Sequence, residues 1–173
     1  MKSPIVIVDY DPAWAERYEA ERQRLVAALG SRITVVEHVG STSVPGLGAK
    51  PVIDIMIGVR HLDDAQYCIS PMQALGYEYV PALEAQLPER RYFRQNTGGI
   101  RSHQVHMVEE GGAFWQRHLA FRDYLRAHPD AAREYEALKR ALAAQYGADR
   151  AGYTDAKTEF IRRIETLALS GSA

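Results

Sequence analysis

One stretch decides the fold of this chain: HVGSTSVPGLGAKPVIDIMI, residues 38–57. Its first part is a loop rich in Gly, Ser and Pro, which runs from Gly40 to Lys50. Its second part, Pro51 to Val59, is the strongest predicted strand of the chain, because β-branched residues dominate it. A glycine-rich loop that leads into a hydrophobic strand predicts a ligand site where the two meet.

The predicted strand carries one residue that needs a physical explanation, Asp54. Side chains alternate between the two faces of a strand, so Ile53, Ile55 and Ile57 share an aliphatic face that belongs against helices. Asp54 and Met56 share the other face. A buried carboxylate is costly unless it is paired or binds a cation. Asp54 therefore forms an ion pair with a neighbouring Arg or Lys, lies on a sheet face open to water, or is a metal-binding or catalytic carboxylate in a cleft.

The loop before this strand has the composition of a phosphate-binding segment. Gly40, Ser41, Thr42 and Ser43 are small, so the backbone can approach a ligand closely. Hydroxyl groups and backbone N–H groups suit phosphate oxygens. Lys50 adds a positive charge for the same anion. These five residues are the predicted phosphate ligands of the loop.

The remainder of the chain mixes strands with helices and ends in helices. Further strands are predicted at residues 5–8, 33–39, 77–80, 91–95 and 104–109, the last two joined by a turn at 96–99. Helices are predicted at residues 12–29, 62–75, 113–127, 129–147 and 154–169. This order predicts a single α+β domain over residues 1–173, with a mixed sheet, helices packed on one face and a helical C-terminal third.

The composition is that of an ordinary globular domain. The 173 residues are 46% hydrophobic and 25% charged, with a formal net charge of −1. A balanced charge argues against an extended nucleic acid as partner. The single cysteine, Cys68, excludes an intramolecular disulfide. Because no apolar run has the length of a membrane helix or of a secretory signal, we expect a cytoplasmic protein with no membrane partner.

Three segments of the chain resemble the GrpB family: His38 to Leu47, Ala49 to Pro51 and Ile53 to Ile55. The resemblance extends over most of the chain through a further set of residues: His103, His106, Tyr153 and the run Lys157 to Ile161. It implies a nucleotidyltransferase-like fold related to the DNA polymerase β superfamily. The family name itself implies no established activity.

The wider superfamily implies a specific metal chemistry. In its active members a Gly-Ser pair precedes a strand with two carboxylates at positions i and i+2, and a third carboxylate lies nearby. Together they hold two Mg²⁺ ions that clamp a nucleoside triphosphate and activate the attacking hydroxyl. By this resemblance Gly40 and Ser41 match the pair, and Asp54 matches the first carboxylate and is the expected Mg²⁺ ligand. Met56 stands at i+2, and a thioether is a poor ligand for Mg²⁺.

Four residues from other segments are predicted to reach the same cleft. His103 and His106 lie on opposite faces of their strand, and we expect His106 to face the cleft. It acts there as a metal ligand or general base, or is only hydrogen-bonded across the sheet. Arg94 and Arg101 bracket the hairpin turn as phosphate ligands. Lys157 is predicted in a first helical turn, which disfavours a cation, so a structural carboxylate or a bound anion should lie nearby.

Three functions account for these residues. The first is a metal-assisted nucleotidyltransferase that acts on a nucleotide and a small acceptor, with Asp54 and His106 as catalytic residues. The second is a non-catalytic module that binds a nucleotide or phosphorylated small molecule and has lost the second metal carboxylate. The third is a phosphate-handling hydrolase that uses His106 and one metal ion at Asp54.

Overall fold

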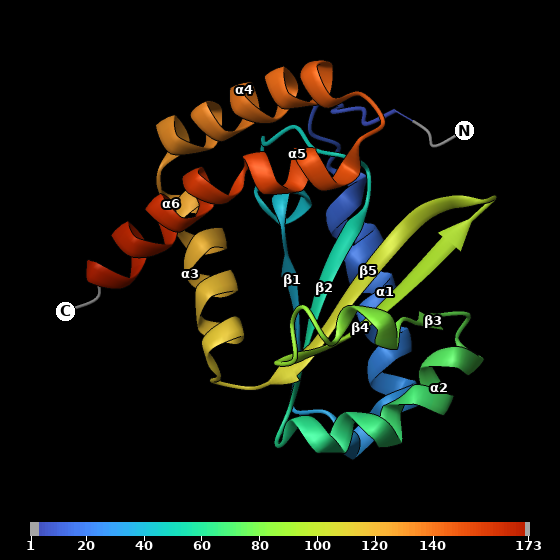
Figure 1. Ribbon diagram of the computed structural model, residues 1–173. Helices are drawn as coiled ribbons and strands as arrows, with labels where there is room; N and C mark the ends of the chain where they lie inside the picture. The colour runs from blue at the N-terminus through green and yellow to red at the C-terminus, as the bar shows by residue number, and fades with distance from the viewer. Residues whose placement is uncertain (1–3, 172–173) are drawn as a thin grey trace.

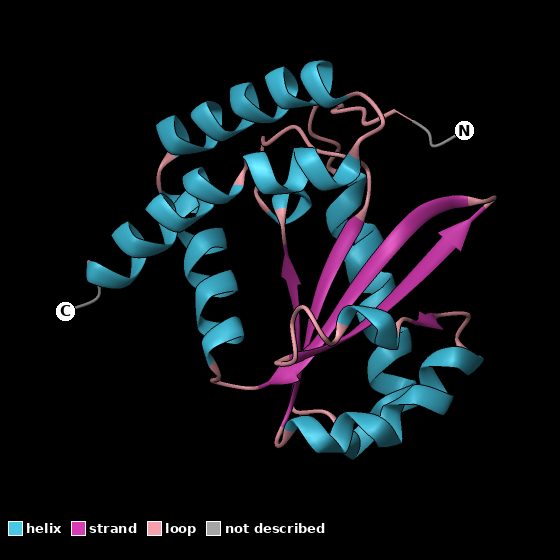
Figure 2. Cartoon of the chain, in the orientation of Figure 1, coloured by secondary structure: helices cyan, strands magenta, loops and turns pink. Residues whose placement is uncertain are grey.

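The computed structural model describes residues 4–171 and contains a five-stranded mixed sheet with helices on both sides (Figures 1 and 2). The strands are β1 (Val35–Val39), β2 (Ile53–Val59), β3 (Glu78–Tyr79), β4 (Arg90–Thr97) and β5 (Ile100–Glu109). Their order is β1-β2-β5-β4-β3. Strands β2 and β5 are parallel, and the other neighbours are antiparallel. The predicted α+β fold with a mixed sheet is confirmed. Residues 1–3 and 172–173, the two ends of the predicted domain, lie outside the described residues.

The helices form two groups, one on each side of the sheet (Figure 1). On one side lie α1 (Ala13–Leu29) and α2 (Ile69–Ala74). The C-terminal third is helical, as predicted: α3 (Ala113–Ala127), α4 (Pro129–Tyr146), α5 (Arg150–Ala156) and α6 (Thr158–Ser170). Helix α3 packs on the opposite side of the sheet from α1, so the prediction of helices on one face only is wrong. Within residues 4–171 none of the helices has the length and apolar character needed to cross a membrane.

The alternation along β2 separates a core face from a polar face. Ile53, Ile55 and Ile57 are at most 2% exposed and belong to one cluster with Trp14 and Leu25 of α1. This is the aliphatic face that the sequence places against helices. The other face of β2 turns toward the C-terminal helices, and that orientation positions the site.

Three predicted elements are wrong in detail. Residues 5–8 form no strand: Val8 makes one isolated bridge to Ala49, and Ile5 packs in a cluster with residues of α4 and α5 instead of joining the sheet. Residues 62–68 form a 3₁₀-helix before α2. The last predicted helix begins earlier than expected, because Asp149 caps α5 with its Oδ1 accepting from the Gly152 N–H at 3.1 Å. It is also divided in two, since α5 ends and α6 begins at Lys157.

Candidate functional site

The pairing of β2 with β5 brings the polar side chains together. Asp54 is in register with Gln104, and Met56 is in register with His106, so all four share the face opposite α1. His103 is in register with Ile53 and therefore lies on the other face. The odd spacing of the two histidines predicts this separation, and the strand register shows it.

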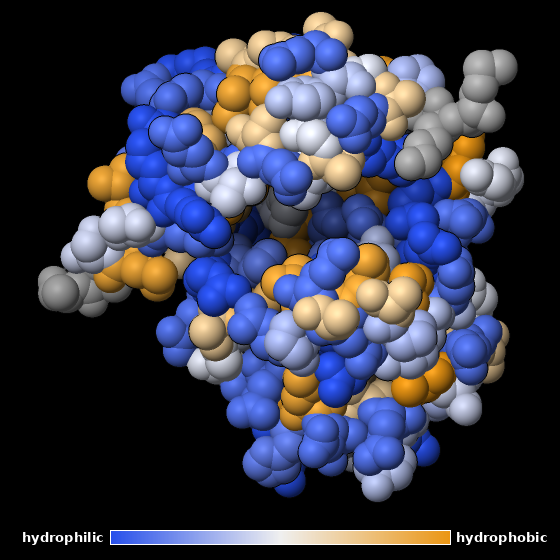
Figure 3. All heavy atoms as spheres, viewed as in Figure 1, coloured by the Kyte–Doolittle hydropathy of each residue, from blue (hydrophilic) through white to orange (hydrophobic). Residues whose placement is uncertain are grey.

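A cavity of about 340 Å³ opens on this polar face (Figure 3). Its wall combines the loop after β1, the start of β2, the centre of β5, and side chains from α3, α4, α5 and α6. Seven of the predicted site residues line it: Gly40, Ser41, Thr42, Lys50, Asp54, His106 and Lys157. Segments distant in the sequence thus meet at one cavity.

The three other predicted residues are not among the wall residues, and each has structural contacts of its own. Arg94 makes a forked ion pair with Glu78, with both nitrogen–oxygen distances at 2.6 Å. The Ser43 hydroxyl donates to the carbonyl of Gly40 at 2.5 Å and so shapes the loop. Arg101 donates to the hydroxyl of Tyr92 at 3.1 Å. Arg94 and Ser43 are occupied by these bonds, and Arg101 reaches the site only through its neighbours.

A chain of hydrogen bonds holds Asp54. The side-chain amide of Gln104 donates to Asp54 Oδ1 at 3.2 Å, and the hydroxyl of Tyr92 donates to Gln104 Oε1 at 2.5 Å. Burial raises the pKa of Asp54 to about 6, although nearby lysines act in the opposite direction. Asp54 therefore changes charge near pH 6.

Three lysines surround this carboxylate: Lys50 from the loop, Lys139 from α4 and Lys157 from the junction of α5 and α6. The amine nitrogens of Lys50 and Lys157 lie 5.3 and 4.5 Å from the ring centre of Tyr153. The amine of Lys139 donates to a backbone carbonyl at 2.5 Å. Within residues 4–171 no carboxylate oxygen lies within 4.0 Å of any of these amines.

Burial and mutual repulsion weaken the charge on these amines. Desolvation, followed by the neighbouring Lys157, lowers the pKa of Lys139 to about 7. Desolvation, followed by Lys50, lowers the pKa of Lys157 to about 8. The pKa of Lys50 is also lowered, mainly by burial. Such a cluster is stabilised in its charged form by an anion in the cavity.

Lys139, Tyr135 and Tyr153 are wall residues that the sequence prediction missed. Lys139 lies on the stripe Tyr135, Lys139, Leu142 of α4, at helical spacing between buried apolar positions. A lysine in such a stripe is the same signal that singles out Lys157, so this residue was detectable. The exposed fraction of Lys139 is 2%.

The contacts of His106 determine which ring nitrogen carries its proton. A guanidinium nitrogen of Arg90 lies 2.8 Å from Nδ1 of His106. Arginine only donates hydrogen bonds, so Nδ1 accepts and the neutral ring carries its proton on Nε2. Burial and then Arg90 lower the pKa of His106 well below its usual value. In this state Nε2 is a hydrogen-bond donor, which suits neither a metal ligand nor a general base.

The residues around Asp54 do not fit a pair of Mg²⁺ ions. Met56 is fully buried in a cluster with Phe114 and Trp115, so its side chain lies under α3 and is no part of the cavity wall. No group of three or more His, Cys, Asp or Glu side chains suited to a metal is found in the described part of the chain. Three amines near one carboxylate also disfavour a cation electrostatically.

His38 precedes the loop but faces away from the cavity, toward α1. Its ring stacks on Tyr18 with 4.5 Å between ring centres, and Nε2 lies 3.0 Å from Oγ1 of Thr42. Burial, followed by Arg126 and Arg122, lowers its pKa to about 4. His38 is therefore a neutral structural residue at pH 7.

This depressed pKa of His38 predicts acid sensitivity of the fold. An unfolded histidine takes up its proton near pH 6.5 but the folded one only near 4, so stability is complete above pH 6.5 and is lost as the pH falls. We expect His38 to contribute a loss of about 2 kcal/mol in unfolding free energy between pH 7 and 5. Urea unfolding at both pH values measures it.

The matched variant for this measurement is His38→Gln, which lacks the titrating group. Asp54, whose raised pKa acts in the opposite direction, is the same in both proteins and cancels in the comparison. Equal pH dependence in the two proteins would show that His38 is not the source.

With the geometry established, comparison with known proteins places the chain. Residues 4–166 match the family described as GrpB protein. The chain belongs to the GrpB family. Among solved structures, this GrpB domain is similar to the conserved protein GrpB from Enterococcus faecalis. The two are 38% identical with a TM-score of 0.87, over 96% of this chain and 99% of that chain.

Other GrpB relatives differ in length. The UPF0157 protein YqkA of Bacillus subtilis is 43% identical over 95% of this chain and 47% of its own length. The glutamate-rich protein GrpB of Alkalihalophilus pseudofirmus is 32% identical over 94% of this chain and 95% of its own length. A dephospho-CoA kinase of Mycolicibacterium paratuberculosis is 32% identical over 93% of this chain and 45% of its own length. This chain thus spans about half the length of some curated relatives.

More distant structures share the fold of the GrpB chain. The Cid1 poly(U) polymerase with MgGTP bound is 14% identical with a TM-score of 0.54, over 80% of this chain and 44% of that chain. The GLD-2/RNP-8 complex gives 14% identity and a TM-score of 0.56, over 86% of this chain and 58% of that chain. These likenesses show a nucleotidyltransferase-like fold.

Proposed function

We propose that the cavity binds the phosphate group of a small phosphorylated molecule through Lys50, Lys139 and Lys157, without a divalent cation. The observation that carries this proposal is the convergence of three amines that have no carboxylate within 4.0 Å in the described residues. Buried charge is costly unless it is paired. A bound phosphate supplies the missing negative charge, and the loop residues Gly40 and Ser41 line the same cavity.

The ligand class that we favour is a nucleotide or nucleotide-like molecule. The fold is shared with proteins that handle nucleoside triphosphates, and the cavity lies beside the matching Gly-Ser loop and Asp54. Some relatives that contain a similar segment are named dephospho-CoA kinase. Dephospho-CoA is therefore one of the ligands to be tested.

Metal-assisted nucleotidyl transfer is the second candidate, because Gly40, Ser41 and Asp54 lie together as that chemistry requires. The buried Met56 and the protonated Nε2 of His106 weigh against it. The same state of His106 weighs against the hydrolase. We therefore favour phosphate binding without a metal over both enzymatic candidates. The effect of Mg²⁺ on ligand binding distinguishes them.

Calorimetric titration with pyrophosphate, ATP and dephospho-CoA tests the proposal, each in EDTA and in Mg²⁺. We expect binding in EDTA that Mg²⁺ does not strengthen. Lys50→Met and Lys157→Met should each weaken binding about tenfold, because each removes one charge-assisted contact. Affinity should be highest between about pH 6, where phosphate gains its second charge, and about pH 7, above which Lys139 loses its proton, and it should fall further near pH 8, where Lys157 does so.

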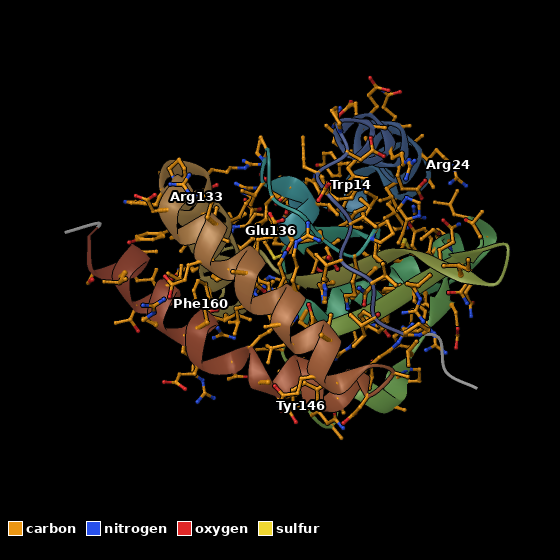
Figure 4. The ribbon with its side chains drawn as sticks, turned by 90° about the horizontal axis from the view of Figure 1, so that it is seen from above. Trp14, Arg24, Arg133, Glu136, Tyr146 and Phe160 are labelled. Atoms are coloured by element: carbon orange, nitrogen blue, oxygen red, sulfur yellow. The ribbon has the colours of Figure 1, made fainter. Side chains whose placement is uncertain are left out.

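Arg133→Met is the control for loss of one positive charge, because the Arg133 side chain is 72% exposed at the outer end of α4 (Figure 4). Arg133→Met should bind the ligands with the same affinity as the unsubstituted protein, within experimental error. Binding that needs Mg²⁺, accompanied by transfer of a nucleotidyl group to an acceptor, would replace the proposal with the transferase.

A further inference from the structure

The chain uses its two types of cationic residue differently. It contains 4 lysines and 17 arginines, and three of the lysines line the cavity. All ion pairs found among residues 4–171 are made by arginines. Arginine holds phosphate with a forked set of donors and stays charged, whereas lysine loses its proton readily when buried. Phosphate binding alone does not require lysine at all three positions, and lysine is the cationic residue that can also supply an uncharged amine.

Lys157 and Lys50 are both partly exposed, and neither amine donates a hydrogen bond to any described residue. Lys157 is the nearer of the two to Tyr153. Lys139 differs, because it is 2% exposed and its amine donates to the Gly48 carbonyl at 2.5 Å. The amines of Lys50 and Lys157 both lie over the ring of Tyr153, at 5.3 and 4.5 Å from its centre, respectively. Two positive charges therefore lie near one another.

This arrangement activates an amine. Burial and the neighbouring Lys50 lower the pKa of Lys157 to about 8, so a useful fraction is neutral near pH 7. A lysine that is desolvated beside a second cation is an established form of activated nucleophile. The neutral amine has a free electron pair with which to attack a carbonyl carbon.

Two groups at the cavity are suited to supply protons. Asp54 interacts electrostatically with Lys157 and titrates near pH 6. The hydroxyl of Tyr153 is buried without a hydrogen-bond partner in the described residues, although Tyr153 lines the cavity. An unpaired buried hydroxyl is costly, and a ligand oxygen in the cavity would satisfy it. An acid beside an amine is what the formation of an imine requires.

We propose that Lys157 forms an imine with the carbonyl carbon of a phosphorylated aldehyde or ketone, while Lys50 and Lys139 hold the phosphate. This rests on the proposed function, and it narrows the ligand to one that also carries a carbonyl group. With such a ligand Lys157 contacts the carbonyl carbon in place of the phosphate. The Lys157 Nζ electron pair attacks the carbonyl carbon, and the carbonyl oxygen takes a proton from Asp54 or Tyr153. The nitrogen then returns a proton to that base. A second proton donation releases the hydroxyl as water and leaves a C=N bond, and nothing is oxidised or reduced.

The test uses pyridoxal 5′-phosphate, an aldehyde that carries a phosphate group, followed by borohydride reduction and mapping of the modified peptides. The chain has only three other lysines, so the assignment is direct. We expect reduced adduct at Lys157 and suppression of it by excess pyrophosphate. Lys157→Arg keeps a positive charge but has no amine that forms an imine, so the adduct should disappear. Pyridoxal without phosphate should react at least about tenfold more slowly, since it lacks the phosphate contacts.

Arg133→Lys adds an ordinary exposed amine on α4 as an internal reference. It should be labelled at least about tenfold more slowly than Lys157, because its neutral fraction at pH 7 is far smaller. Labelling at equal rates would overturn the imine proposal. Binding of pyrophosphate without any adduct at Lys157 would also overturn it and would leave the phosphate site intact. Adduct at Lys157 that forms equally with pyridoxal and resists pyrophosphate would overturn the phosphate contacts and, with them, the proposed function.

Discussion

Replacing Met56 with aspartate should unfold the protein and should not create a second metal ligand. Met56 occupies the position of the second carboxylate of the two-metal arrangement. Its side chain is fully buried against Val39, Val108, Phe114 and Trp115 under α3. A carboxylate there loses its hydration and gains no partner, so we expect a loss of at least about 4 kcal/mol in unfolding free energy. Urea or thermal unfolding measures this loss.

The control for this substitution is Met56→Leu, which conserves volume and hydrophobic character. It should cost less than about 1.5 kcal/mol. A folded Met56→Asp protein that binds Mg²⁺ in calorimetry would contradict the prediction, because it would place the side chain in the cavity beside Asp54. In that case this fold could hold two Mg²⁺ ions once a carboxylate stands at position 56.

The second large effect is expected for Gly40→Ala. The backbone of Gly40 has φ +72°, which disfavours residues with a side chain. A Cβ atom there would lie 2.6 Å from Oδ2 and 2.9 Å from Cβ of Asp54, so the strand or the loop must move. We expect a loss of about 2 to 4 kcal/mol in unfolding free energy, together with loss of pyrophosphate binding. Unfolding and calorimetry on the same preparation test both parts.

Gly46→Ala separates the two causes of this loss. Gly46 also has a positive φ, +82°, but a Cβ atom there would meet no atom within 4 Å. It should therefore show only the backbone cost, about 1 kcal/mol, with binding retained. Equal losses in the two variants would show that the contact between Gly40 and Asp54 does not matter.

Much of the site follows from local rules that the sequence contains. Strand alternation places Asp54 and Met56 opposite the aliphatic face, and the odd spacing of His103 and His106 divides them between faces. Lys157 is conspicuous as a cation on an apolar helical stripe. The expected helix start before it was wrong, because Asp149 caps α5 and Lys157 lies at the junction with α6.

Other parts of the site depend on contacts between distant segments. Arg94 lies beside the hairpin turn in the sequence, which is why it was predicted to reach the cavity. The pairing of β3 with β4 instead places Glu78 beside it as an ion-pair partner. The proton position on His106 depends on Arg90, sixteen residues earlier, because strands β4 and β5 bring the two side chains together. Neither partner is specified by local propensity.

The sequence by itself determined the α+β fold, the direction in which Asp54 points and the loop that approaches it, because these depend on side-chain periodicity and on the small size of neighbouring residues. The tertiary structure alone decided that the Met56 position is closed to metal and that Lys139 joins the predicted lysines around Asp54. Helix α3 packs over Met56 and closes that position to metal, and α4, α5 and α6 bring Lys139 and Lys157 to the carboxylate. The physical reason is that burial and charge clustering are properties of packed segments, and no residue carries them before the chain has folded.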